Sequence, residues 1–253
     1  MARALALAAA LAASLLAVSG TGGASAQTPK RGGTALLNRG GSPPPCLNFL
    51  NPRCTASLNL AARFFVGLAM PGAFEFRDDG TQRPRLVSRV EFTRKAPFIL
   101  TYHIRREARW NDGVPVTAAD FVFTYGALRK HFPPSSGGMD MTQVRSVRAM
   151  APKTLRVVLS SRFAAWRSLF DIVLPRHALA GADLTSIWND AVDDPGTRRP
   201  IGSGPFLISR YERDRRDPRI VLTRNPRYWG PHPAYLDRIV FWWSGLGPTT
   251  EEM

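Results

Sequence analysis

The stretch from Ala108 to Leu128 constrains the fold most strongly, because it combines a tight turn with a helix start. Its first half holds four turn-forming residues: Asn111, Asp112, Gly113 and Pro115. Thr117 occupies the expected N-cap position, and Asp120 follows three residues later, as in a capping box. Apolar residues then recur at helical spacing: Phe121, Val122, Tyr125 and Leu128. The stretch predicts a strand, a tight turn and a capped helix. On this pattern alone, a structural corner is favoured over a chemical site.

The N-terminus has the pattern of a secretory signal peptide. Arg3 supplies a short basic region, residues 4–18 are mostly apolar, and Ala24-Ser25-Ala26 forms a cleavage motif before Gln27. A membrane anchor is the alternative, but the apolar run is short and rich in small residues. We therefore expect residues 1–26 to be removed and the chain to be exported to the outer side of the cytoplasmic membrane.

The chain has two cysteines, Cys46 and Cys54. Export would place them in an oxidising compartment, where a pair most simply forms a disulfide. A two-cysteine metal site would need further ligands, and no histidine lies near in the sequence. The sequence predicts a Cys46–Cys54 disulfide and no metal or cofactor.

The formal net charge is +15, with a pI of about 11.1. Such basicity is compatible with a nucleic-acid-binding or polymer-binding protein. However, the arginines are scattered, and the densest clusters, at 198–199 and 210–219, lie in expected turns, the second of them with acidic residues interleaved. No alternation of aromatic and basic residues suggests base stacking. We interpret the charge as a solvated surface and expect no nucleic-acid partner. A secreted basic protein that binds anionic envelope polymer remains an alternative.

Hydrophobic periodicity and turn residues predict an alternation of strands and helices. In the strand at 99–105, Leu100, Tyr102 and Ile104 should point inward. The other expected elements are a strand at 33–38, a loop at 39–45, a helix at 57–68, a hairpin around 74–80, a β segment on either side of residues 95–97, a loop with a Pro/Ser/Gly run at 131–138, a hairpin at 144–160, helices at 163–170 and 184–188, strands at 202–208 and 220–223 joined by a charged turn, and a last strand at 236–243.

Three features invite a chemical interpretation, and each has a simpler structural one. His177 has no accompanying nucleophile motif, which favours a structural role. The acidic cluster Asp190, Asp193 and Asp194 lacks the spacing of a calcium loop and is expected to be a solvated loop. The segment 202–205 is not a dinucleotide fingerprint, because a proline and a strand pattern replace the required helix. A secreted hydrolase is a further alternative, but the chain lacks the motifs of the common hydrolase classes.

Three blocks together resemble the family 5 extracellular solute-binding proteins, the dipeptide-, oligopeptide- and nickel-type receptors of ABC importers. The blocks are Trp110–Phe121, the pair 201–206 and 222–230, and 233–241, and they stand in the family's order. The resemblance extends from about Arg31 to Phe241. It assigns structural roles to these motif residues: Trp110, Asp112, Gly113, Pro115, Thr117, Asp120, Gly202, Gly204, Pro205, Asn225, Tyr228 and Trp229.

The resemblance implies an α/β lobe like that of periplasmic binding proteins, with mixed sheets and an inserted α+β subdomain. The expected domains are a signal peptide at 1–26, the first part of lobe I at 27–70, the insertion at 71–170, and the continuation of lobe I at 171–253. Family members are much longer, so we expect the N-terminal half only, without the second lobe.

The implied function is capture of a small solute, most often a peptide, and its delivery to an ABC permease by a monomeric, non-enzymatic receptor whose lobes close on the solute. In the family, the loop after the first strand approaches the ligand. The resemblance therefore gives Arg39, Gly40, Gly41 and Ser42 a ligand-binding interpretation, with a solvated turn as the alternative.

Overall fold

The computed structural model describes residues 30–51, 54, 59–77, 79–131, 141–214 and 217–243. The predicted signal peptide at 1–26, most of the loop expected at 131–138 and the last residues, 244–253, lie outside this range. The chain divides into two units, Met1–Lys30 and Arg31–Met253, and all elements named below belong to the second. No helix in the part of the chain that is described has the length and apolar character needed to span a membrane.

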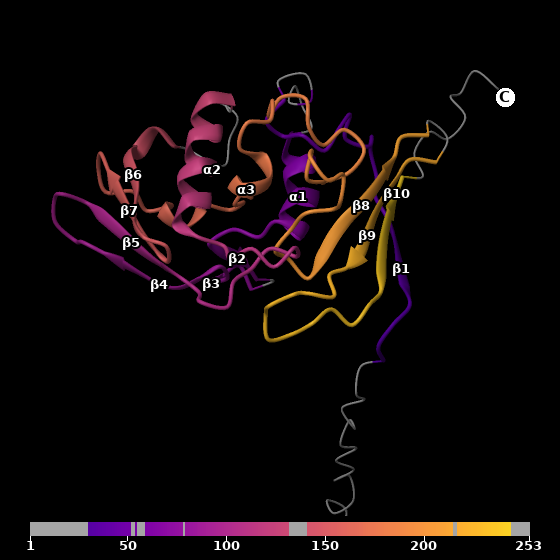
Figure 1. The fold of residues 1–253 in the computed structure, drawn as a ribbon, viewed down its shortest axis with the longest axis horizontal. Coiled ribbons are helices and arrows are strands. Elements are labelled where there is room, and N and C mark those ends of the chain that lie inside the picture. Colours follow the sequence, from indigo (N-terminus) through magenta and orange to yellow (C-terminus); the bar gives the residue numbers. More distant parts are fainter. Residues whose placement is uncertain are drawn as a thin grey trace, which may run out of the picture. The chain divides into compact units, whose positions relative to one another are not determined.

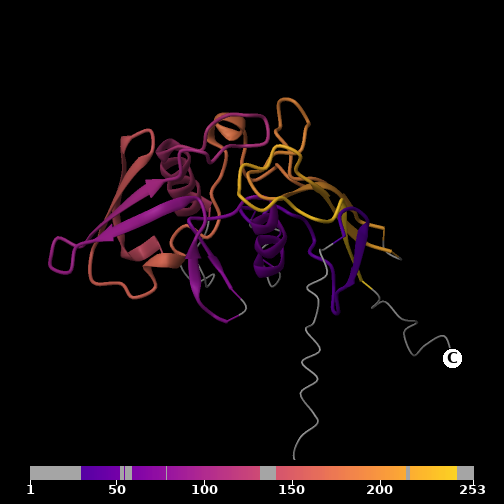
Figure 2. The same ribbon diagram turned by 90° about the horizontal axis from the view of Figure 1, so that it is seen from below.

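One four-stranded sheet joins the two ends of the described chain. Its order is β1 (Thr34–Asn38), β10 (Arg238–Trp242), β9 (Arg219–Arg224) and β8 (Phe206–Glu212). β1 runs parallel to β10, and the other neighbours are antiparallel. Helix α1 (Asn59–Ala69) lies between this sheet and the second four-stranded sheet (Figures 1 and 2). The buried ring of Phe65 on α1 lies 4.9 Å from that of Phe241 on β10, measured between centroids.

The second four-stranded sheet is antiparallel throughout. Its order is β4 (Val87–Phe92), β5 (Ile99–Ile104), β7 (Thr154–Leu159) and β6 (Val144–Ala151). The alternation predicted for β5 is confirmed, because Leu100, Tyr102 and Ile104 are all buried. Helix α2 (Ala118–His131) packs on this inner face, with the rings of Tyr102 and Phe121 6.4 Å apart between centroids. One apolar cluster continues from this sheet through α1 to the first sheet.

Short elements complete the described fold: the hairpin of β2 (Phe74–Phe76) and β3 (Gln82–Pro84), the 3-10 turns η3 (Met141–Gln143) and η4 (Trp166–Ser168), and helix α3 (Arg176–Leu179). Cys46 and Cys54 form the predicted disulfide, with their Cα atoms 5.9 Å apart. Both cysteines are buried.

Two predicted helices are wrong. At 163–170 only the single turn η4 forms: the N–H of Leu169 donates three residues back to the carbonyl of Trp166 at 3.4 Å, as in a 3-10 turn, and the hydroxyl of Tyr102 donates to the same carbonyl at 3.3 Å. At 184–188 the chain makes a turn. The carbonyl of Leu184 accepts the side-chain amide of Asn48 at 2.9 Å, and Trp188 has a φ of 59°, which a right-handed helix excludes.

Candidate functional site

The turn that begins at Trp110 is fixed at both ends. Trp110 is fully buried, and its backbone N–H donates to the carbonyl of Val114 at 2.8 Å. The carboxylate of Asp112 accepts the N–H of Val114 at 3.0 Å, and Gly113 has a φ of 100°, where glycine avoids a steric penalty. Asn111 accepts the N–H of Gly202 at 2.9 Å through its side chain. The turn is therefore bonded directly to the second motif block.

The cap of α2 confirms one half of the predicted capping box, the bond from the N–H of Thr117 to the Asp120 carboxylate, and differs in the other half. Thr117 was expected to accept the N–H of Asp120, but that N–H donates to the backbone carbonyl of Thr117 at 3.1 Å. The Asp120 carboxylate does the capping instead: it accepts the N–H of Thr117 at 2.7 Å and its hydroxyl at 3.2 Å. It also accepts the N–H of Arg176 at 2.9 Å. The Asp120 carboxylate therefore accepts hydrogen bonds from two parts of the chain, the start of α2 and the start of α3.

This bond to Arg176 places the next residue, His177, against the turn. The Nε2 atom of His177 lies 2.6 Å from a carboxylate oxygen of Asp112, and its ring lies 6.1 Å from that of Trp110 between centroids. The acidic cluster nearby is engaged locally: Asp193 faces Arg198 at 3.3 Å, and Asp194 accepts the N–H of Gly196 at 2.8 Å. Within the described ranges, no group of three or more metal-ligating side chains is present.

The glycines of the second motif block receive the C-terminal end of α1. The N–H groups of Ser203 and Gly204 donate to the carbonyl of Ala69 at 3.0 and 2.8 Å. A Cβ on Gly204 would lie only 2.4 Å from the carbonyl oxygen of Leu68. The strand predicted from residue 202 therefore begins only at Phe206, because Gly202 bonds to Asn111 and residues 203–204 bond to α1.

The other half of the second block, residues 222–230, fixes this junction from the other side. The side chain of Asn225 donates to the carbonyl of Gly204 at 2.8 Å, and the indole N–H of Trp229 donates to the carbonyl of Ser203 at 3.0 Å. The amide N–H of Asn225 donates to the carbonyl of Pro205 at 2.9 Å. The motif residues thus converge on the last turn of α1.

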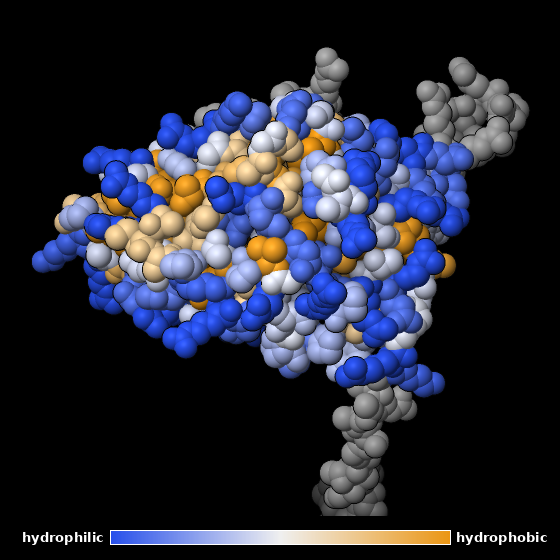
Figure 3. Space-filling view, viewed as in Figure 1, coloured by the Kyte–Doolittle hydropathy of each residue, from blue (hydrophilic) through white to orange (hydrophobic). Residues whose placement is uncertain are grey.

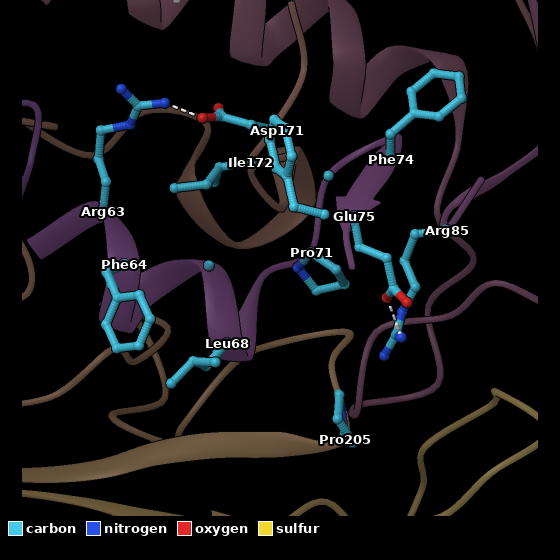
Figure 4. Close-up of a pocket in the computed structure, with 13 residues that line it drawn as sticks. Arg63, Phe64, Leu68, Pro71, Phe74, Glu75, Arg85, Asp171, Ile172 and Pro205 are labelled. Atoms are coloured by element: carbon cyan, nitrogen blue, oxygen red, sulfur yellow. Dashed lines mark hydrogen bonds and ion pairs between the residues drawn. The ribbon is translucent and has the colours of Figure 1, made fainter. Parts of the chain in front are cut away.

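A cavity of about 550 Å³ opens beside that last turn (Figure 4). Its walls come from α1, the β2 region, the segment before α3 and the start of β8. The lining residues are Arg63, Phe64, Gly67, Leu68, Pro71, Gly72, Phe74, Glu75, Phe76, Arg85, Asp171, Ile172 and Pro205. A volume of this size falls in the range of small-molecule sites.

Two ion pairs lie on opposite sides of this cavity, with apolar side chains between them (Figure 4). Arg63 pairs with Asp171 on one side, and Arg85 pairs with Glu75 on the other. Burial lowers the pKa of the Arg63 guanidinium, which nevertheless stays charged. The second carboxylate oxygen of Asp171 and the Nε of Arg85 are buried and have no hydrogen-bond partner among the described residues. Asp171 and Arg85 both line the cavity, so an acidic side chain lies on one side and a basic one on the other.

The loop residues singled out from the sequence do not line this cavity, although Arg39 contacts a residue that does. Arg39 is exposed, and its guanidinium carbon lies 5.3 Å from the ring centroid of Phe64, which does line the cavity. Gly40, Gly41 and Ser42 are exposed and are absent from the described lining.

Sequence reasoning missed the four charged residues of the ion pairs. Two had a usable signal: Arg63 is the only charged residue in the apolar α1, and Asp171 is the only acid between 160 and 182.

The comparisons with known proteins cover the region that contains these blocks. The sequence profile described as "Bacterial extracellular solute-binding proteins, family 5 Middle" matches residues 81–244. The chain belongs to this family. The oligopeptide-binding protein OppA of Mycobacterium tuberculosis is 33% identical over 208 residues, which cover 78% of this chain and 33% of OppA. The probable monoacyl phosphatidylinositol tetramannoside-binding protein LpqW of the same species is 28% identical over 191 residues, covering 72% of this chain and 29% of LpqW.

Solved structures show the same fold. A periplasmic EDTA-binding protein, EppA, superposes with a TM-score of 0.67 at 23% identity, over 85% of this chain and 40% of that one. The oligopeptide-binding protein AppA of Bacillus subtilis, solved with a nonapeptide, gives a TM-score of 0.66 at 20% identity, over 85% and 41%. The chain therefore spans about a third of the curated relatives' length and about 40% of these solved chains.

Proposed function

We propose that the chain supplies one wall of the peptide site of an extracytoplasmic receptor that serves an ABC importer. The observation that carries this proposal is the cavity beside α1, which has an ion pair on each of two sides and apolar residues between them. Membership of a solute-binding family and the similarity to an oligopeptide-binding protein support it.

A peptide zwitterion matches the chemistry of this cavity. Its amino terminus would donate to the carboxylate of Asp171, and its carboxylate would accept from Arg85. Apolar side chains would lie against Phe64 and Leu68. Arg39, stacked over Phe64, would lie at the rim, and a backbone contact from Gly40 to Ser42 would complete this side. All of these contacts are noncovalent, so no enzymatic step is involved.

The domain organisation and location form part of the same proposal. Residues 27–70 and 171–253 would belong to lobe I, with residues 71–170 inserted into it. The remaining length of the relatives would supply a second lobe, which closes over the solute and presents it to the permease. The leader at 1–26 would direct export.

Ligand-observed NMR with the dipeptide Ala-Phe tests this assignment at millimolar concentration. We expect the peptide signals to be attenuated by the chain, and much less so after N-acetylation or with Asp171→Asn. Asp217→Asn is the matched control, because Asp217 forms an exposed ion pair with Arg219 and does not line the cavity. Equal attenuation by the two variants would contradict the role of Asp171. No attenuation by the parent chain would contradict a peptide site.

A further inference from the structure

Half-buried aromatic rings gather at one end of the second sheet. Phe92 and Phe98 flank the tip of the β4–β5 hairpin and stack with centroids 6.4 Å apart and an interplanar angle of 21°. Trp166, from the segment after β7, stacks on Phe92 at 6.4 Å and 18°. The N–H of Leu159 donates to the carbonyl of Phe98 at 2.9 Å, which joins the two segments. Each of the three rings keeps part of its surface in water.

Four exposed cations lie in the same two segments as these rings: Arg94, Lys95, Arg162 and Arg167. None of the four forms an ion pair with any residue that the structure describes. The guanidinium carbon of Arg167 lies 4.4 Å from the Trp166 ring centroid. Neither 92–98 nor 160–170 contains an acidic residue, and the adjacent Glu91 is engaged by Arg89 and His103. Figure 3 shows strongly hydrophilic residues at the end of this hairpin with hydrophobic residues beside them.

We propose that the tip of the β4–β5 hairpin (92–98) and the segment 160–167 dock this protein on an anionic lipid bilayer. Unpaired arginine and lysine side chains complement acidic headgroups, and each cation near such a surface strengthens binding about fivefold. Phenylalanine and tryptophan rings partition into the interfacial layer beneath the headgroups. A soluble polyanion would use the charges but would leave the aromatic rings without a role.

The outer face of the same sheet provides a matched comparison. Arg148 and Arg156 are exposed, lie opposite each other on β6 and β7, and form no ion pair within the described part of the chain. The Arg94→Gln/Lys95→Gln and Arg148→Gln/Arg156→Gln double variants therefore remove the same charge from the same sheet. Only the first pair adjoins the aromatic rings.

Co-sedimentation of the full chain with vesicles of phosphatidylcholine and phosphatidylglycerol at 0.15 M salt tests the proposal. We expect binding to these vesicles and little to pure phosphatidylcholine. Removing both tip charges should weaken binding on the order of 20-fold. The outer-face variant should stay within about twofold of the parent. Every variant carries the same N-terminal leader, so its contribution cancels.

A second measurement reports whether rings enter the bilayer. Spin-labelled lipid should quench the tryptophan emission of the parent chain, and Trp166→Phe should remove most of that quenching. Equal weakening by the tip and outer-face variants would overturn the proposal, because it indicates general attraction of a basic protein. Tip-dependent binding to soluble dextran sulfate without vesicle binding would also overturn it and assign the site to a polymer.

Discussion

Asp120 makes the contacts on which the motif turn depends. Its carboxylate is buried and accepts two backbone N–H groups, those of Thr117 and Arg176, as well as the Thr117 hydroxyl. Asp120→Ala removes a charged acceptor from both backbone groups, so we expect a loss of about 2–3 kcal/mol in the free energy of unfolding. Thr117→Ala removes only the hydroxyl bond and should cost about 0.5–1 kcal/mol. Urea unfolding monitored by circular dichroism measures both values.

If Thr117 were the capping acceptor that the sequence suggests, Thr117→Ala would lose the usual N-cap energy of about 1 kcal/mol or more. The costs of the two substitutions would then be closer to each other. A Thr117→Ala cost equal to that of Asp120→Ala therefore contradicts the observed geometry. Both residues were identified from their spacing, but the sequence could not show which side chain accepts. That choice depends on the N–H of Arg176, which lies 56 positions away.

The charged residues of the cavity show a similar limit. The isolation of Arg63 in an apolar helix and of Asp171 in an acid-poor stretch can be read from the sequence. Their pairing joins positions 108 apart and depends on how α1 lies against the segment before α3. Only the packed structure brings these two charges into one cavity.

At the scale of elements, the space around two glycines leads to opposite predictions. Gly204 contacts the end of α1, whereas Gly126 lies on an open part of α2. Gly204→Ala would place a methyl group against the carbonyl of Leu68, and we expect a cost of about 3 kcal/mol. Gly126, within α2, has open space around its Cβ position, so Gly126→Ala should stabilise the chain by roughly 0.5–1 kcal/mol. Denaturant midpoints of the two variants, compared with the parent, should shift in opposite directions. A midpoint for Gly204→Ala that equals or exceeds the parent's would refute the close approach at Gly204, and a lower midpoint for Gly126→Ala would refute the open space there.

Elements were predictable where their own residues determine them. The alternation in β5 and the hairpin of β6 and β7 follow local periodicity, and the structure confirms them. The predicted apolar face of α2 is confirmed in part: Phe121 and Leu128 are buried, whereas Val122 and Tyr125 are half-buried. The predicted helices at 163–170 and 184–188 are wrong, and in both segments a distant side chain bonds to a backbone carbonyl. Tyr102 bonds to the carbonyl of Trp166, and Asn48 bonds to that of Leu184. No local pattern contains that information.

At the scale of the whole molecule, the parallel pairing of β1 with β10 could not be derived from residue patterns. Thr34 pairs with Arg238, so the first and last described strands are neighbours in one sheet. The residue pattern of each segment predicts a strand. The pairing of the two strands, however, depends on how the roughly 200 residues between them fold. The family resemblance supplied the expected mixed sheets, and the solved relatives show the same fold.

The proposed division into lobes leads to a prediction about affinity. The chain spans about a third of the length of OppA, and we propose that it forms one wall of the peptide site. A single wall leaves a bound peptide half in water, whereas small-molecule sites bury most of their ligand. Partly exposed ion pairs contribute roughly 0–1 kcal/mol each, and closure of two lobes cannot add to them. We therefore expect this chain to bind dipeptides and oligopeptides no more tightly than about millimolar, as measured by isothermal titration against a mixed peptide library.

A longer chain that includes the remaining length of the relatives should bind far more tightly. Micromolar binding by the 253-residue chain alone would show that the cavity beside α1 is already a complete site.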